Sequence, residues 1–231
     1  MSVIERTGTY GTYYGSPKGS SSPCSKAQQQ VNAKYIYSYL KAKGWTINAV
    51  SAILGNMQAE SSINPGRWQS DNVGGGPAFG IVQWDPFSKY INWAESSGFS
   101  DYTTIDANLA RIIWEVDNKQ QWYGRSEWAG MSFKDFTQST KSVNFLARGF
   151  IICYERPADQ STSAQEYRAS LAESWYTYLT GVTPEPPTPD EPDDPIIPSE
   201  NKKRKKYNFI LMNVNKRRMT YYDKRRVYKH Y

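Results

Sequence analysis

The sequence has few of the residues on which several common enzyme classes depend. It contains a single histidine, His230, next to the last residue. Zinc peptidases with histidine ligands and Cys–His proteases or amidases need a histidine inside the folded body. The two cysteines, Cys24 and Cys153, are too few to define a disulfide framework. We therefore expect neither a metal nor a cofactor, which leaves carboxylate chemistry.

Long apolar segments are also missing. No apolar run approaches the ~20 residues of a membrane-spanning helix, and the N-terminus lacks the apolar core of a signal peptide. We expect no membrane span and no export by a signal of the chain's own. Strand signals are few in residues 26–182, which predicts a mainly α-helical fold.

The net charge of +6 is unevenly distributed along the chain. Residues 1–182 hold 16 basic and 15 acidic residues, residues 183–200 hold six acidic residues and no basic one, and residues 201–231 hold 12 basic residues and one acidic residue. Together with the Gly, Ser, Thr and Tyr content of the N-terminus, this division predicts four parts. They are a flexible N-terminal arm at 1–25, a helical domain at 26–182, an acidic proline-rich linker at 183–200 and a basic aromatic tail at 201–231.

The segment that precedes Glu60 has the apolar spacing of a helix that faces a core. Its apolar residues recur at i, i+3, i+4 and i+7. We expect Thr46 to cap the start of this helix and Asn64-Pro65-Gly66 to stop it, so that Glu60 lies in its last turn. The apolar residues of this stripe are Val50, Ile53, Leu54 and Met57.

Similar patterns predict six more helices in this domain. Asp85 is expected to cap one of them, with Pro86 at its first position. The approximate ranges are 26–43, 86–97, 105–118, 133–139, 143–154 and 164–179.

A carboxylate at the position of Glu60 is unfavourable for two reasons. Partial burial disfavours its charged form, and so does the carbonyl end of the helix dipole. A glutamate that stays protonated near neutral pH is what a general acid for glycosidic bond cleavage needs. The alternative is a solvated residue at the end of a helix.

Several short motifs around Glu60 occur in a defined order. They are Gly55-Asn56-Met57-Gln58, Glu60-Ser61, Asn64-Pro65-Gly66, Gln83-Trp84, Ile112-Ile113-Trp114-Glu115 and Tyr154-Glu155-Arg156-Pro157. In this order and spacing, residues 28–181 resemble the phage tail lysozyme family, which is related to goose-type lysozymes and lytic transglycosylases.

The resemblance implies a lysozyme-like, mostly helical fold that acts on the glycan strands of bacterial peptidoglycan. It implies that Glu60 is the catalytic acid and that Gln83 contacts substrate, which suits an amide because it can both donate to and accept from a sugar. Trp84 is either a sugar contact or plain core. Further candidates for substrate binding are Ser61, Tyr154 and Glu155.

The sequence does not place a second catalytic carboxylate. Asp71, Asp85 and Glu155 are candidates, and each has an ordinary alternative as a loop acid, an N-cap or an arginine partner. Hydrolysis, with lytic transglycosylation as the alternative, and the stereochemical outcome also stay open, since a sequence carries no carboxylate separation.

The basic tail alternates aromatic and apolar residues with clusters of positive charge. We expect it to dock on a phage tail protein, which predicts a virion-associated enzyme; nucleic acid, an anionic wall polymer or a solvated tail are the alternatives. A structural tail protein that uses the fold only to bind glycan is the alternative function. The residues predicted to dock are Phe209, Ile210, Leu211, Arg217 and Arg218.

Overall fold

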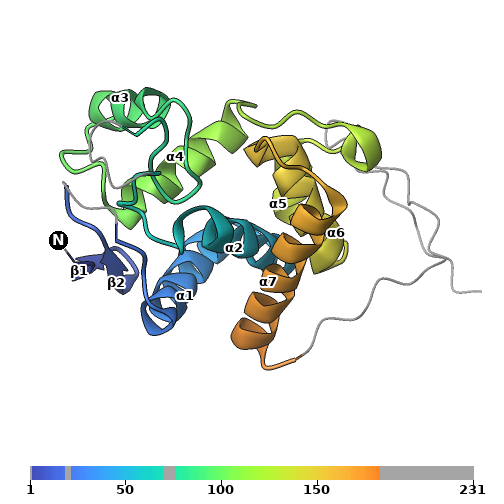
Figure 1. The fold of residues 1–231 in the computed structure, drawn as a ribbon, viewed down its shortest axis with the longest axis horizontal. Coiled ribbons are helices and arrows are strands. Elements are labelled where there is room, and N and C mark those ends of the chain that lie inside the picture. The colour runs from blue at the N-terminus through green and yellow to red at the C-terminus, as the bar shows by residue number, and fades with distance from the viewer. Residues whose placement is uncertain (1, 19–21, 70–75, 183–231) are drawn as a thin grey trace, which may run out of the picture. The chain divides into compact units, whose positions relative to one another are not determined.

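The computed structural model describes residues 2–18, 22–69 and 76–182 (Figure 1). Helices dominate this part of the chain, as predicted. The predicted linker and docking tail at 183–231 lie outside the described residues. In order, the elements are β1 (Ile4–Gly8), β2 (Gly11–Gly15), α1 (Lys26–Ala42), α2 (Ile47–Ser61), α3 (Ser88–Ser96), α4 (Ile105–Asp117), the 3₁₀ turn η1 (Ser126–Trp128), α5 (Phe133–Gln138), α6 (Val143–Phe150), the π-helical turn η2 (Ile151–Glu155) and α7 (Thr162–Thr180).

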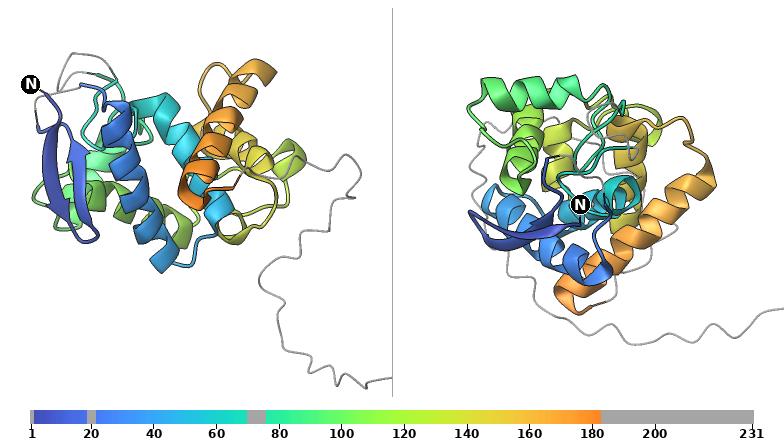
Figure 2. Two further views of the ribbon diagram at one scale, coloured as in Figure 1. Left: turned by 90° about the horizontal axis from the view of Figure 1, so that it is seen from below. Right: turned by 60° about the vertical axis from the view of Figure 1, so that its left-hand side comes forward.

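Helix α2 lies in the middle of the fold, with α1 on one side and α6 and α7 on the other (Figures 1 and 2). The side chain of Thr46 accepts a hydrogen bond from the Ala49 N–H at 3.2 Å, so the predicted N-cap is confirmed. The apolar stripe predicted for this helix is completely buried, and this burial is what fixes α2 in the core. Its members are Val50, Ile53, Leu54 and Met57.

The end of α2 differs from the prediction. The helix stops at Ser61 because Ser62 and Ile63 adopt the left-handed conformation, with φ of 57° and 55°. Their N–H groups donate to the last free carbonyls of the helix, on Gln58 and Met57. The Asn-Pro-Gly sequence that was expected to stop α2 therefore follows a helix that has already ended. Glu60 lies in the last turn, as predicted.

The other helices match their predicted ranges with two exceptions. Helix α3 begins at Ser88 with Phe87 as its N-cap residue, so the predicted cap at Asp85 is wrong. The helix expected to reach residue 154 is α-helical only to Phe150 and continues as the π-helical turn η2.

The N-terminal arm predicted to be flexible is instead a folded β-hairpin. Strands β1 and β2 pair antiparallel, with Ile4 opposite Gly15. The hairpin cannot fold on its own apolar content, but it gains partners from the body. Tyr13 is buried against Tyr35, and both the N–H and the carbonyl of Tyr14 bond to the side chain of Asn32.

A salt bridge and hydrogen bonds also tie the hairpin to the start of α4 and to the residues just before it. Arg6 pairs with Asp101 at 2.5 Å, and the Thr9 N–H donates to Asp106 at 3.0 Å. The prediction failed because these partners are distant in sequence.

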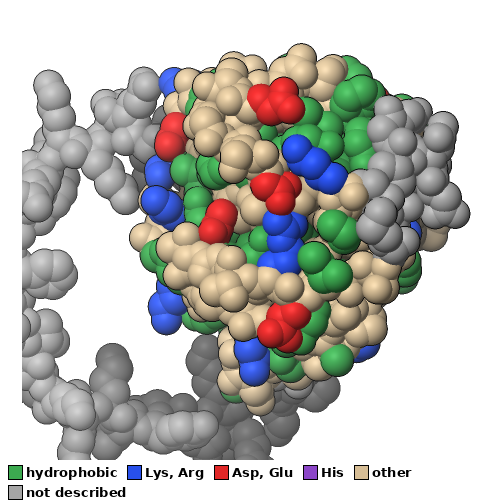
Figure 3. All heavy atoms as spheres, turned by 90° about the vertical axis from the view of Figure 1, so that its left-hand side faces the viewer, with side chains coloured by type: hydrophobic (Ala, Val, Ile, Leu, Met, Phe, Trp, Pro, Cys, Tyr) green, Lys and Arg blue, Asp and Glu red, His purple; other side chains and the backbone are tan. Residues whose placement is uncertain are grey.

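The surface of the described body mixes charges of both signs. Figure 3 shows acidic and basic side chains next to one another on one face, consistent with the near balance of 16 and 15 in residues 1–182. None of the helices in the described ranges is long and apolar enough to cross a bilayer.

Candidate active site

Hydrogen bonds connect the last turn of α2 to the turn that follows residue 79. The hydroxyl of Ser61 donates to the carbonyl of Ile81 at 2.8 Å, and the Ile81 N–H donates to Asn108 on α4 at 2.9 Å. Ser61 is completely buried. Its side chain therefore holds the site together from inside, whereas the neighbouring Glu60 side chain keeps 18% of its surface exposed.

An arginine for which no role was predicted faces Glu60. Arg168 of α7 places its Nη2 2.5 Å from Oε1 of Glu60, and its Nη1 donates to Oδ1 of Asn56 at 3.2 Å. Asn56 is itself fixed, since its amide donates to the carbonyls of Ala52 and Ala147. The guanidinium of Arg168 is thus held by α2 and holds the carboxylate of Glu60 in turn.

The sequence did contain a signal for Arg168. This residue is on the buried face of α7, four residues before Ala172 and seven before Trp175, and both of these are buried. A charged residue in an apolar stripe needs an ionic partner. No cation on another helix was predicted as a partner of Glu60.

Gln83 lies in the turn linked to Ser61 and has an unusual backbone conformation for a non-glycine residue, with φ of 52°. Its Nε2 donates to the carbonyls of Arg67 and Gly80 at 3.0 and 2.8 Å. These two bonds fix the orientation of the amide. Within the described residues, the buried Oε1 of Gln83 has no hydrogen-bond partner, which leaves its capacity to accept a hydrogen bond unused.

Trp84 and Tyr154 point into the core. Trp84 is 2% exposed, stacks on Tyr90 at 4.4 Å between ring centroids, and donates from Nε1 to Glu115. The hydroxyl of Tyr154 donates to the other oxygen of Glu115 at 2.5 Å. These positions favour the core alternative for Trp84 and leave Tyr154 no surface toward a groove.

Glu115 is the completely buried carboxyl that joins these side chains. Its partner in the same helix, Arg111, donates from Nε at 2.9 Å. Burial raises the pKa of Glu115, and the hydrogen bond from Tyr154 and the charge of Arg111 oppose this rise. Glu115 belongs to the motif Ile112-Ile113-Trp114-Glu115, but no role was predicted for it.

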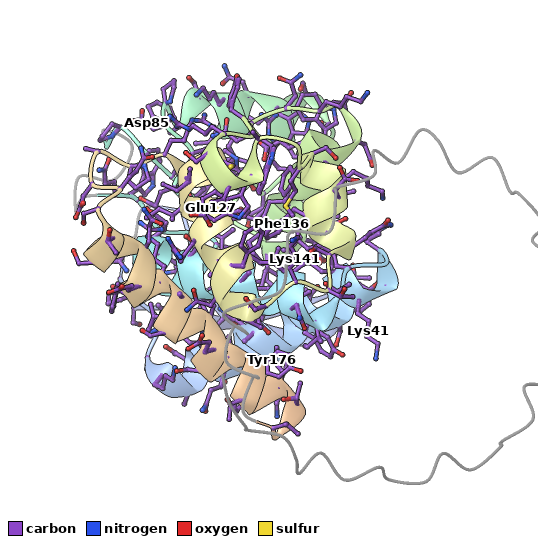
Figure 4. All side chains as sticks on the ribbon, turned by 90° about the vertical axis from the view of Figure 1, so that its right-hand side faces the viewer. Lys41, Asp85, Glu127, Phe136, Lys141 and Tyr176 are labelled. Carbon is purple, nitrogen blue, oxygen red and sulfur yellow. The ribbon has the colours of Figure 1, made fainter. Side chains whose placement is uncertain are left out.

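The candidates for a second carboxylate differ in their surroundings. Asp71 lies outside the described residues. Asp85 is exposed and lies at the rim of the molecule in Figure 4. Glu155 ends the π-helical turn η2, and its Oε1 is buried without a partner in the described part of the chain. Burial and the negative charge of Glu60 raise the pKa of Glu155 well above its ordinary value.

Metal ligands do not gather in this region. Across residues 2–18, 22–69 and 76–182, no cluster of three or more His, Cys, Asp or Glu side chains is placed to hold a metal ion.

Comparisons with known proteins identify the family of this chain. The chain is 48% identical over 159 residues to morphogenesis protein 1 of Bacillus phage B103, and the match covers 68% of this chain and 41% of that protein. The chain thus spans less than half the length of this relative. The sequence model of the phage tail lysozyme family matches residues 31–179, which include Glu60, Gln83, Glu155 and Arg168. This chain belongs to the phage tail lysozyme family.

Proposed function

We propose that this chain is a virion-associated muramidase. In this proposal it cleaves the β-1,4 bond between N-acetylmuramic acid and N-acetylglucosamine in the glycan strand of peptidoglycan, so that a phage tail can penetrate the cell wall. Membership of the phage tail lysozyme family supports the glycan substrate, and the relative named for morphogenesis in a phage supports the virion location.

The position of Glu60 carries the catalytic part of the proposal. The partly exposed carboxyl of Glu60 lies in the last turn of the central helix α2, and Arg168 of α7 fixes its orientation. Glu60 is the general acid that donates a proton to the leaving glycosidic oxygen. The fixed amide of Gln83 supports a sugar contact, since its Oε1 can accept a hydrogen bond from a hydroxyl or an acetamide N–H.

Hydrolysis is the proposed reaction, and the fragments released from purified walls decide it. Mass spectrometry of hydrolysis products shows a reducing-end sugar. A 1,6-anhydro end instead identifies the chain as a lytic transglycosylase.

The basic tail at 201–231 is the segment proposed to attach the chain to the virion. Phe209, Ile210 and Leu211 bind a phage tail protein, and basic residues including Arg217 and Arg218 meet an acidic surface on it. The interleaving of these apolar and basic residues in the sequence supports docking on a protein more than on nucleic acid.

A turbidity assay on purified walls tests the catalytic proposal with Glu60→Gln. We expect this variant to keep its fold and its binding to glycan and to lose turnover by on the order of 10² or more. Glu95→Gln, an exposed position on α3, is the matched control and should keep full activity. Binding to walls without any clearing by the wild-type protein would favour the non-catalytic glycan-binding alternative.

A further inference from the structure

Glu155 lies between two residues that are each anchored. On one side, Tyr154 is buried and its hydroxyl is bonded to Glu115. On the other side, Arg156 is in the left-handed conformation, and its Nη1 donates to the carbonyls of Gln121 and Cys153 at 2.6 and 2.9 Å. The backbone between them belongs to a π-helical turn, a feature that is frequent at functional sites. The direction of the Glu155 side chain is therefore fixed from both sides.

One oxygen of the Glu155 carboxyl has no hydrogen-bond partner in the part of the chain that the structure describes. This oxygen, Oε1, is also closed off from solvent. A polar atom that is buried without a partner destabilises the fold, so it calls for an explanation. A role in binding or chemistry is one such explanation.

Charged groups from several elements face this carboxyl. They are Glu60 of α2, Arg168 of α7, Glu115 of α4 and the adjacent Arg156. Burial has the largest effect on the pKa of Glu155 and the charge of Glu60 the next largest; both raise it, whereas the two arginines lower it. The pKa stays well above the ordinary value, so Glu155 retains its proton where a free glutamate has lost it.

Glu60 and Glu155 thus form an unequal pair. Glu60 has the ion pair with Arg168, at 2.5 Å, whereas the Oε1 of Glu155 is not paired with a cation of the described residues. Where two carboxyl groups interact and only one of them is paired with an arginine, a shared proton is held most stably by the unpaired group. The unliganded site then contains one carboxylate, one guanidinium and one neutral carboxyl.

We propose that Glu155 is the second catalytic carboxyl of this site, which stores the proton that Glu60 delivers and then accepts the proton of the attacking water. This inference rests on the proposed function and extends it to the missing partner of Glu60.

The proton balance of the proposed cycle closes without a further reagent. When the glycan enters, Glu155 releases its proton through solvent to the carboxylate of Glu60. Glu60 passes this proton to the leaving oxygen as the bond from that oxygen to the anomeric carbon breaks. A water molecule forms the new bond to the anomeric carbon and gives a proton to the carboxylate of Glu155. The pair returns to its starting state, and one water has been added across the glycosidic bond.

The test compares the pH dependence of wall hydrolysis by the wild type and by Glu155→Gln. Glutamine has the shape of a neutral glutamic acid but can neither release nor accept the proton. We expect kcat to fall by on the order of 10² or more with KM within about threefold, and the alkaline limb of the profile to move to lower pH. If Glu155 only packs against the site, the alkaline limb of this variant should not move. Thermal unfolding of each variant verifies the fold.

Two further variants test whether the carboxyl of Glu155 itself takes part in the reaction. Glu155→Asp retains a carboxyl and should keep the alkaline limb close to that of the wild type. Glu155→Ala should recover at least about tenfold in rate on addition of sodium formate, a small carboxylate that can act as the base, but not on addition of sodium chloride at equal ionic strength. If Glu155→Gln cleaves walls within about threefold of the wild type and with the same pH profile, the inference is wrong.

The variant Glu60→Gln distinguishes a failure of this inference from a failure of the proposed function. If this variant is inactive while Glu155→Gln remains fully active, the inference fails and the proposed function stands. If Glu60→Gln is as active as the wild type, or the wild type shows no turnover, the proposed function fails and the inference with it.

Discussion

Gly55 of α2 and Ala172 of α7 lie against each other where the two helices cross. A methyl group on Gly55 would be 2.6 Å from the backbone nitrogen of Ala172 and equally close to the carbonyl oxygen of Arg168. Backbone atoms on a packed helix cannot move aside as the end of a flexible side chain can. The absence of a side chain at residue 55 is therefore what allows α7 to bring Arg168 to Glu60.

The substitution Gly55→Ala tests this crossing. We expect the free energy of unfolding to fall by about 1–3 kcal/mol, because the added methyl group forces the two helices apart. Activity on walls should fall as well, since the same shift moves the guanidinium of Arg168 away from Glu60. Urea denaturation measures the first effect, with Ser174→Ala on the exposed side of α7 as the control that should change by less than about 0.5 kcal/mol.

Substitutions of Arg168 test its part in the proposed reaction. In Arg168→Gln, Glu60 loses its ionic partner, so we expect kcat to fall at least about tenfold, with a smaller change in KM. The pKa of Glu155 should rise further, because the positive charge of Arg168 lowers it. Arg168→Lys keeps the charge but not the second bond to Asn56, and its rate should be intermediate. Equal rates for all three proteins would show that Arg168 only packs.

The buried proton of Glu155 also predicts how stability depends on pH. Because its pKa is raised in the folded state, the folded protein holds a proton that the unfolded chain releases. This contribution to the free energy of unfolding is complete below the ordinary value of 4.5 and is lost as pH rises through the raised pKa. Glu155→Gln removes the dependence, so its stability relative to the wild type should increase with pH.

Chemical denaturation of both proteins between about pH 4 and pH 9 measures this difference. The raised pKa of Glu115 adds a slope of the same sign that both proteins share. A constant difference between the two proteins over this range would mean that Glu155 ionises normally in the folded state.

Truncation of the chain tests two points separately: whether the helical domain cleaves walls by itself, and whether the basic tail is needed for incorporation into particles. A chain that ends at Gly181 should fold and cleave walls nearly as well as the full chain, because α7 is complete there and Gly181, with φ of 74°, closes it. A chain that ends at Glu200 should be absent from assembled particles, since the predicted docking residues have been removed. Normal amounts of that shorter chain in particles would assign the basic tail another role, such as binding an anionic wall polymer.

The parts of the fold that were predictable depend on local sequence. The cap at Thr46 and the apolar stripe of α2 are contained in a few consecutive residues, and so is the last turn that holds Glu60. Arg168 was not predicted because it meets Glu60 across 108 residues of sequence. The burial of Glu155 depends on how the end of α6 unwinds into a π-helical turn, which the spacing of apolar residues does not reveal. The hairpin was missed for a similar reason, since its stability comes from residues that lie elsewhere in the chain.

The contacts of this hairpin have a consequence for synthesis of the protein. Thr9 bonds to Asp106, a separation of 97 residues, and Arg6 bonds to Thr103 across the same distance. Chains grow at about 5–20 residues per second, so the first strand waits roughly 5–20 seconds for its partners to be made. During translation these contacts of the N-terminus thus form well after it has left the ribosome, although it is the first part of the chain to do so.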